Sequence, residues 1–346
     1  MRESQERVQG TREGAKGAAG LQVIFGTGPV GLAAAGLLLE KGLSVRMVNR
    51  SGKASAAAFS AGRTGSLEIR AADAMDTRAV SAAARGATHI YYCVNTLYPE
   101  WERTLPVMHE NIMRAAIENK AVFAAAENLY MYARGVPVIN EETRVDPPSR
   151  KGRLMQRLHE RLVQAGGAGS LQWTAVRASD FYGPLAAGQS LFGTERFLDP
   201  VSAGKRPLLW GNLDLPHTFT YVGDYGRALA VAALSAEARG KAWIVPNDRT
   251  MTTRELARLF FDAAGLSNGK APRILRMPRA GFAALGLFSP LMREVVEVLY
   301  QKEEPYVVDG SRFQAAFGLQ PTTLEEGVRR TLECYRESAA ADVSPA

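Results

Sequence analysis

Three glycines near the start of the chain have the spacing of a loop that binds phosphate. They occur in Gly26-Thr27-Gly28-Pro29-Val30-Gly31, directly after the apolar run Leu21–Phe25 and at the start of a segment with helical periodicity. In such a turn the first glycine permits a tight bend, the second lets the backbone approach a pyrophosphate, and the third lets helix and strand pack closely. Amides at the helix N-terminus add positive potential. The pattern therefore predicts a dinucleotide site formed by Gly26, Thr27, Gly28, Pro29, Val30 and Gly31.

Residues that follow the later apolar runs help to choose the dinucleotide. An acidic residue at the end of the second strand usually holds the ribose hydroxyls of NAD, but this chain has Asn49 and Arg50 there. If Arg50 faces a 2′-phosphate, NADP is favoured over NAD; the alternative is that Arg50 is solvated or stacks on the adenine. We also expect Asp73, Ala74 and Val94 at the cofactor site, with Asp73 accepting from the adenine amino group. A flavin is less favoured because the chain has no second nucleotide-binding motif.

Apolar runs alternate with helical segments, which is typical of a parallel sheet covered by helices. The predicted strands are Leu21–Phe25, Ser44–Val48, Leu67–Ala71, His89–Val94, Ala121–Ala125 and Trp173–Arg177. The predicted helices between them are Val30–Lys41, Ala79–Ala84, Thr104–Asn119 and Arg150–Ala165. The sequence therefore predicts an α/β protein with a Rossmann doubly wound parallel sheet.

After Pro184 the predicted elements become shorter, and glycine and proline become more frequent. We expect a smaller C-terminal substrate region that is interleaved with the sheet. Its predicted elements are a strand over Phe219–Asp224 and helices over Tyr225–Leu234, Thr252–Ala264, Leu291–Tyr300 and Thr323–Tyr335. The expected organisation is a disordered leader over 1–20, an NAD(P)-binding Rossmann domain over 21–184, a substrate-binding region over 185–336 and a loose tail over 337–346.

Composition excludes several classes of protein. The 346 residues are 46% hydrophobic and 22% charged, as in a globular protein. The net charge of +7 comes from basic residues spread along the chain, so we expect no nucleic-acid partner. No apolar run reaches the roughly eighteen residues of a membrane span. Two cysteines, Cys93 and Cys334, indicate reduced thiols in a cytoplasmic protein. No histidine pair has metal-ligand spacing, so we expect no metal.

From about Leu21 to Tyr335 the chain resembles the extended short-chain dehydrogenase/reductases, the NAD-dependent epimerase/dehydratase family. Besides the glycine turn, residues 177–184 (RASDFYGP) resemble the family's R-x-x-x-x-Y-G-P, and Phe219–Asp224 resembles its strand ending in V-x-D. Residues 309–327 resemble its C-terminal segment. The resemblance implies an NAD(P)-dependent enzyme acting on a small molecule, with substrate contacts near Tyr182 and His217. It is also compatible with a homodimer that pairs through two helices.

The family's usual catalytic residues are missing from this chain. When its Tyr-x-x-x-Lys motif is placed on the sequence, Lys151 occupies the tyrosine position, Met155 the lysine position and Asn128 the position of the upstream serine. Hydride delivery to a carbonyl makes an alkoxide, which needs a cation, a hydrogen-bond donor or a proton source. We therefore expect Lys151, Tyr130 and Asn128 to take these roles. The alternatives are a surface cation for Lys151 and a core aromatic residue for Tyr130.

The sequence gives less direct information about the substrate than about the cofactor. His217 is a candidate acid or base because the unperturbed imidazole pKa lies near neutrality, but a structural histidine is the alternative. Aromatic side chains that could form either an apolar pocket or the core are Phe192, Phe197, Trp210, Phe219, Phe282 and Phe288. We expect an NAD(P)H-dependent oxidoreductase that reduces a carbonyl or activated C=C or C=N bond of a small apolar or aromatic metabolite, as in secondary-metabolite tailoring. The alternatives are a cofactor-binding redox sensor without turnover and a sugar-nucleotide epimerase or dehydratase.

Overall fold

The computed structural model describes residues 20–53, 64–186, 190–266 and 273–343. The predicted disordered leader, apart from Gly20, lies outside the described residues. Within the part of the chain that is described, no helix combines the length and the hydrophobicity needed to cross a membrane.

A central sheet of seven parallel strands has the order β11-β6-β5-β4-β1-β2-β3. Its strands are β1 (Leu21–Phe25), β2 (Val45–Asn49), β3 (Leu67–Ala71), β4 (Ala87–Tyr92), β5 (Val122–Asn128), β6 (Trp173–Ala178) and β11 (Lys241–Ile244). The chain moves outward from β1 to β3, returns to β4 beside β1 and continues outward on the other side. This order confirms the predicted doubly wound α/β fold. It also puts a switch point between β1 and β4, where such sheets bind ligands at the carboxyl ends of their strands.

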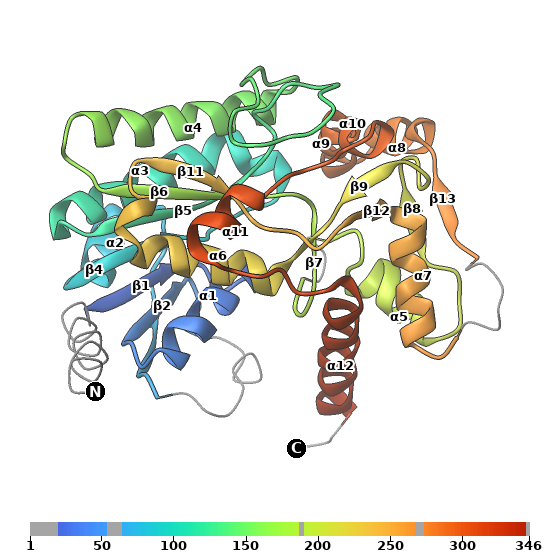
Figure 1. Cartoon of the computed structure of the whole chain (residues 1–346), viewed down its shortest axis with the longest axis horizontal. Helices are drawn as coiled ribbons and strands as arrows, with labels where there is room; N and C mark the ends of the chain where they lie inside the picture. Colours follow the sequence, from blue (N-terminus) through green and yellow to red (C-terminus); the bar gives the residue numbers. More distant parts are fainter. Residues whose placement is uncertain (1–19, 54–63, 187–189, 267–272, 344–346) are drawn as a thin grey trace, which may run out of the picture.

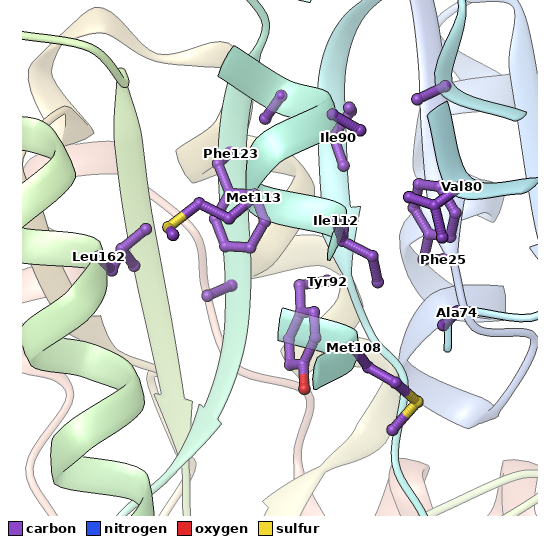
Figure 2. Packing of buried hydrophobic residues seen from close by; sticks show 14 of the residues in the cluster. Phe25, Ala74, Val80, Ile90, Tyr92, Met108, Ile112, Met113, Phe123 and Leu162 are labelled. Carbon is purple, nitrogen blue, oxygen red and sulfur yellow. The ribbon is translucent and has the colours of Figure 1, made fainter. Parts of the chain in front are cut away.

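Helices cover both faces of the sheet (Figure 1). One face is covered by α2 (Thr77–Ala84), α3 (Trp101–Asn119) and α4 (Arg150–Gly167). The other is covered by α1 (Pro29–Glu40), α6 (Val222–Leu234) and α11 (Ser311–Phe317). Figure 2 shows the first of these cores, where Phe25 and Phe123 of the sheet lie beside side chains of α3 such as Ile112. Burial of apolar side chains on both faces is the main force that holds the sheet in place.

The remaining elements form a smaller region beside the carboxyl end of the sheet (Figure 1). Its strands are β7 (Phe181–Tyr182), β8 (Leu208–Trp210), β9 (Pro216–Thr218), β10 (Thr220–Tyr221), β12 (Thr250–Thr252) and β13 (Leu275–Met277). Its helices are α5 (Asp199–Ser202), α7 (Thr253–Ala263), α8 (Arg279–Gly286), α9 (Pro290–Val298), α10 (Tyr300–Glu303) and α12 (Leu324–Val343). Short turns of other helical types occur at Tyr98–Glu100, Thr194–Leu198 and Ala236–Ala238. A separate apolar core, with Phe192, Phe197 and Phe260 at its centre, holds the region together.

The central strand β11 has no counterpart among the predicted strands, and two predicted segments end at other residues than expected. The strand expected over Phe219–Asp224 stops at Tyr221, and α6 begins at Val222. The Asp224 carboxylate lies in the first turn of α6 and accepts hydrogen bonds from the backbone nitrogen and the hydroxyl of Thr322. At the C-terminus, α12 continues to Val343, whereas a loose tail was predicted from Glu337 onward.

Candidate active site

The glycine turn lies at the carboxyl end of β1, at the switch point of the sheet. Gly26 has a φ of +114°, and a Cβ atom added there would lie 2.4 Å from the carbonyl oxygen of Cys93. A Cβ atom on Gly31 would lie 2.2 Å from the carbonyl oxygen of Gly26. At Gly28, by contrast, an added Cβ atom would have no neighbour within 4 Å. The turn is therefore closely packed at its first and third glycines and open at the second.

The N-terminus of α1 supplies amides beside this open position. Gly28 is the N-cap residue, no side chain caps the helix, and Pro29 occupies one of its first positions. The amides of a first helical turn have no acceptor within the helix. They are therefore available to an anion, so that the residues present fit the pyrophosphate of a dinucleotide.

The other predicted cofactor residues lie along the same edge of the sheet. At the end of β2, Asn49 Nδ2 donates to Thr27 Oγ1 at 2.7 Å and thereby ties β2 to the glycine turn. Arg50 and Asp73 are exposed after β2 and β3, and the Asp73 carboxylate accepts a hydrogen bond from the amide of Met75. The side chain of Ala74 is different, because it is buried in the core beneath this edge.

A cavity of about 200 Å³, here called the first cavity, opens at the carboxyl ends of β4, β5 and β6. Its wall contains four residues singled out from the sequence, namely Val30, Val94, Asn128 and Tyr130. Met155, at the position of the family's usual lysine, also lines it. The wall therefore runs from Val30 at the start of α1 to Met155 in α4.

An adjoining cavity of about 260 Å³, here called the second cavity, has a mostly apolar wall. Its apolar members are Leu97, Leu191, Leu208, Trp210, Met277, Phe282, Leu291, Met292, Val295, Val298 and Leu299. Of the aromatic residues noted in the sequence, Trp210 and Phe282 thus line a cavity. Phe192, Phe197 and Phe219 belong to the core instead, and the side chain of Phe288 is exposed.

The two cavities meet at a group of polar residues. Asn95, Tyr98, Tyr130, Asp180 and Gln301 line both cavities. The hydroxyls of Tyr98 and Tyr130 lie 2.6 Å apart. Burial raises the pKa of Tyr98 to about 12, and burial together with Tyr98 and Asp180 raises the pKa of Tyr130 well above 10. Both phenols therefore keep their protons at neutral pH, and since one hydroxyl donates to the other, one proton of the pair is left to donate toward the cavities.

The predicted catalytic residues are only partly brought together. Asn128 lies at the end of β5 and lines the first cavity, and its Oδ1 accepts a hydrogen bond from the amide of Tyr130 at 3.0 Å. Lys151 is buried at the start of α4, but it lines neither cavity. Its ammonium forms ion pairs with Glu294 and Glu297 of α9 instead. In this structure Lys151 joins α4 to α9, whereas Tyr130 and Asn128 face the first cavity.

His217 and Tyr182, the predicted substrate contacts, line neither cavity. Tyr182 is buried in the core of the C-terminal region, where it packs against Tyr221 and Phe260. His217 is buried behind the wall of the second cavity, and its Nε2 lies 2.9 Å from Asp180 Oδ2. Burial and the nearby Lys302 ammonium lower the pKa of His217 to about 4, so the imidazole is neutral at pH 7.

Asp180 and Lys302 also belong to the site, although they are not among the residues predicted from the sequence. Lys302 Nζ of α10 lies 2.6 Å from Asp180 Oδ2 and 3.2 Å from His217 Nε2. Burial alone would raise the pKa of Asp180, but Lys302 and His217 hold it well below its usual value. Asp180 could have been found from its place directly after β6, since ligands bind beyond the carboxyl ends of parallel strands. No local pattern marks Lys302.

A second buried ionic group supports the floor of the first cavity. Glu127 of β5 accepts hydrogen bonds from Arg177 Nε of β6 at 2.9 Å, and His159 Nδ1 of α4 also lies 2.9 Å from its carboxylate. Burial alone would raise the pKa of Glu127, but His159 and Arg177 hold it at about 2. Arg177 also donates to the hydroxyl of Tyr132 at 2.6 Å. These bonds join β5, β6 and α4 beneath Asn128 and Tyr130.

Comparisons with known proteins agree with this architecture. A solved UDP-glucose 4-epimerase from Thermus thermophilus, in complex with NAD, is 20% identical, with a TM-score of 0.69 over 91% of this chain and 99% of that chain. A dTDP-glucose 4,6-dehydratase from Streptomyces venezuelae with NAD bound is 16% identical, with a TM-score of 0.71 over 93% of this chain and 98% of that chain. A UDP-N-acetylglucosamine 4-epimerase from Methanobrevibacter ruminantium is 15% identical, with a TM-score of 0.72 over 92% of this chain and 99% of that chain. At these identities the likeness concerns the fold.

A search of curated proteins found no match. The family model described as the NAD dependent epimerase/dehydratase family matches residues 23–245, which is more than half of the chain. The match includes the glycine turn and all seven strands of the central sheet, apart from the first two residues of β1. The chain therefore belongs to the NAD-dependent epimerase/dehydratase family.

Proposed function

We propose that this protein is an NAD(P)H-dependent oxidoreductase that reduces a carbonyl, or an activated C=C or C=N bond, in a small apolar or aromatic molecule. The observation that carries the proposal is the apolar second cavity, which adjoins the first cavity through Tyr98, Tyr130 and Asp180. A substrate held among apolar side chains would present its polar group to these residues. A reaction of this kind fits the tailoring of a secondary metabolite.

The glycine turn and the first cavity are assigned to the dinucleotide. Gly28 and the first amides of α1 would hold the pyrophosphate, and Val94, Asn128 and Tyr130 would surround the nicotinamide. When bound, the reduced nicotinamide supplies hydride. Two of the similar structures were solved with NAD, which supports a nicotinamide dinucleotide in this site. The exposed Arg50 after β2 favours NADP as the preferred form.

The second cavity favours an apolar substrate over a sugar nucleotide. A sugar nucleotide brings a diphosphate, which proteins usually bind with several cationic or hydrogen-bonding groups. Among the described residues, the cations in this wall are Arg196 and Lys302, and Lys302 is already paired with Asp180. The similar solved epimerases and dehydratase act on sugar nucleotides, so this substrate class remains the second candidate.

Turnover with defined substrates tests the proposal. Purified protein would be mixed with NADPH or NADH and a panel of aromatic ketones, quinones and UDP-glucose, with absorbance followed at 340 nm. We expect dinucleotide oxidation with aromatic ketones or quinones. Tight dinucleotide binding without turnover across the panel would favour a redox sensor. Conversion of UDP-glucose to an epimer, detected by NMR without net absorbance change, would favour a sugar-nucleotide epimerase.

A further inference from the structure

We propose that Lys302 is the proton donor to the substrate oxygen, and that Asp180 and His217 position it for this role. The inference rests on the proposed function, because it assigns the acid of the carbonyl reduction. It assigns to α10 a role that the family's tyrosine and lysine would have on α4.

Lys302, Asp180 and His217 form a buried cluster beside the junction of the two cavities. Lys302 lines the second cavity, and its carboxylate partner Asp180 lines both cavities at the point where they meet. Lys302 Nζ lies 2.6 Å from Asp180 Oδ2 and 3.2 Å from His217 Nε2, and it also lies 5.0 Å from the centre of the Phe219 ring. An ammonium has three protons to donate. Asp180 and His217 thus fix the ammonium beside the position where the substrate's polar group would lie.

The ionisable groups at this junction differ in how easily they release a proton. Burial lowers the pKa of the Lys302 ammonium, and the Asp180 carboxylate opposes this effect only in part. The pKa of Tyr130 is raised well above 10 by burial and by its neighbours. His217, with a pKa of about 4, is neutral at pH 7, so it can accept a hydrogen bond from the ammonium but is not the acidic imidazolium. Lys302 is therefore the residue whose proton is most easily released, while the one phenol proton of the Tyr98–Tyr130 pair that is not used between the two hydroxyls orients the oxygen by a hydrogen bond.

Lys151, which we place at the position of the family's catalytic tyrosine, is not available to a substrate in either cavity. Its ammonium is bound to Glu294 and Glu297 and lines neither cavity. Met155, at the position of the family's lysine, lines the first cavity but carries no ionisable group. Among the described residues of the second cavity wall, Lys302 is the ammonium that a substrate oxygen would meet.

The step balances as an ordinary carbonyl reduction. The carbonyl carbon gains the hydride lost by the reduced dinucleotide, and the two electrons of the C=O π bond move to oxygen. That oxygen forms a bond to one Lys302 proton, whose N–H electrons remain on Nζ as the lone pair of a neutral amine. The substrate becomes an alcohol, reduced by two electrons. Solvent water then returns a proton to the amine past Asp180, whose side chain is 32% exposed.

A pair of probe substrates separates proton donation from a purely structural ion pair. Reduction of acetophenone makes a strongly basic alkoxide, which needs an acid in the transition state. Reduction of menadione makes a weakly basic hydroquinone anion, which does not need an acid in the transition state. In Lys302→Arg the positive charge is kept but the proton is not released, since the arginine pKa exceeds 12. We expect acetophenone turnover to fall by about a hundredfold or more, as for loss of a general acid, while menadione turnover changes little.

Control variants keep the test decisive if Lys302→Arg folds poorly. Asp180→Asn combined with Lys302→Met removes both charges of the buried pair, so it avoids an uncompensated carboxylate, and acetophenone turnover should again fall far more than menadione turnover. Lys205→Met changes an exposed lysine near α5 and should leave both reactions intact. Equal losses with the two probes, or no loss with either, would overturn the role of Lys302 but not the proposed function. Absence of wild-type turnover with every probe would overturn both.

Discussion

Among single residues, Arg50 is the one that we propose to favour NADP over NAD. Its side chain is exposed at the carboxyl end of β2, beside Asn49, which is bonded to the glycine turn. A guanidinium there would form charge-assisted hydrogen bonds to a 2′-phosphate. Such bonds contribute about 1.5–3 kcal/mol. We therefore expect Arg50→Ala to weaken NADPH binding by about tenfold or more and to leave NADH binding nearly unchanged.

Isothermal titration calorimetry with both dinucleotides measures this effect. Arg78→Ala, at an exposed position on α2, is the matched control and should bind both dinucleotides like the wild type. An equal loss of affinity for NADPH and NADH in Arg50→Ala would mean that Arg50 does not recognise the 2′-phosphate.

Some residues of the site could be predicted from the sequence, and others could not. The glycine turn was predictable because its residues are consecutive, and each has a conformational or packing reason that the structure confirms at Gly26 and Gly31. The ion pair of Asp180 and Lys302 was not predictable, because its members come from a loop and a helix that only the folded chain brings together. Lys151 was placed correctly at the start of a helix, but its partners on α9 could not be seen.

Among the structural elements, α4 and α9 are joined by the ion pairs of the buried Lys151 with Glu294 and Glu297. Arg150 still compensates part of the charge of Glu294 and Glu297 when Lys151 is removed, so the cost is that of the hydrogen bonds lost to these carboxylates, about 1.5–3 kcal/mol. We expect Lys151→Met to lower the free energy of unfolding by roughly this amount and to speed amide hydrogen exchange in α9. Lys151→Arg keeps the positive charge, so both effects should be smaller in that variant. Urea unfolding and hydrogen-exchange mass spectrometry measure the two effects.

The neighbouring arginine offers a control for the same contact. Arg150 also pairs with Glu294 and Glu297, but its side chain is 60% exposed, so Arg150→Met should change stability by less than about 1 kcal/mol. If Lys151→Met leaves hydrogen exchange in α9 unchanged and abolishes turnover, Lys151 has a chemical role rather than this structural one.

The buried ionic group of Glu127, His159 and Arg177, which joins β5, β6 and α4, should make the free energy of unfolding depend on pH. The folded-state pKa of Glu127 is about 2, below the ordinary value of 4.5. A lowered carboxyl pKa contributes stability above pH 4.5, and this contribution is lost as the pH falls toward 2. We expect Glu127→Gln to be less stable than the wild type at pH 7 by roughly 3 kcal/mol, with the difference shrinking at pH 3.

Urea unfolding at both pH values checks this prediction. Glu110→Gln changes an exposed glutamate of α3 that pairs with Arg161, and it should have little effect at either pH. A stability difference between Glu127→Gln and the wild type that is the same at pH 7 and pH 3 would contradict the assigned role of the carboxylate.

For the whole molecule, the fold was more predictable than the site. Six of the central strands were predicted within a few residues, because buried parallel strands appear as short apolar runs between helical segments. The segment Phe219–Asp224 was misjudged at its end, since its apolar residues fit either β10 or the first turn of α6. The second cavity was beyond prediction, because its wall combines segments from Asn95 to Lys302 that only the tertiary fold assembles.

The central claim is that the open turn at Gly28 holds a nicotinamide dinucleotide, and calorimetric titration of wild type and Gly28→Leu tests it most directly. A side chain at Gly28 would enter open space next to the amides of α1, so it should block the pyrophosphate without disturbing the fold. We expect heat of binding for the wild type with NADPH, weaker binding with NADH, and no binding for a Gly28→Leu variant whose thermal unfolding is unchanged. Absence of heat for the wild type with both dinucleotides, or equal affinity in the variant, would contradict the claim.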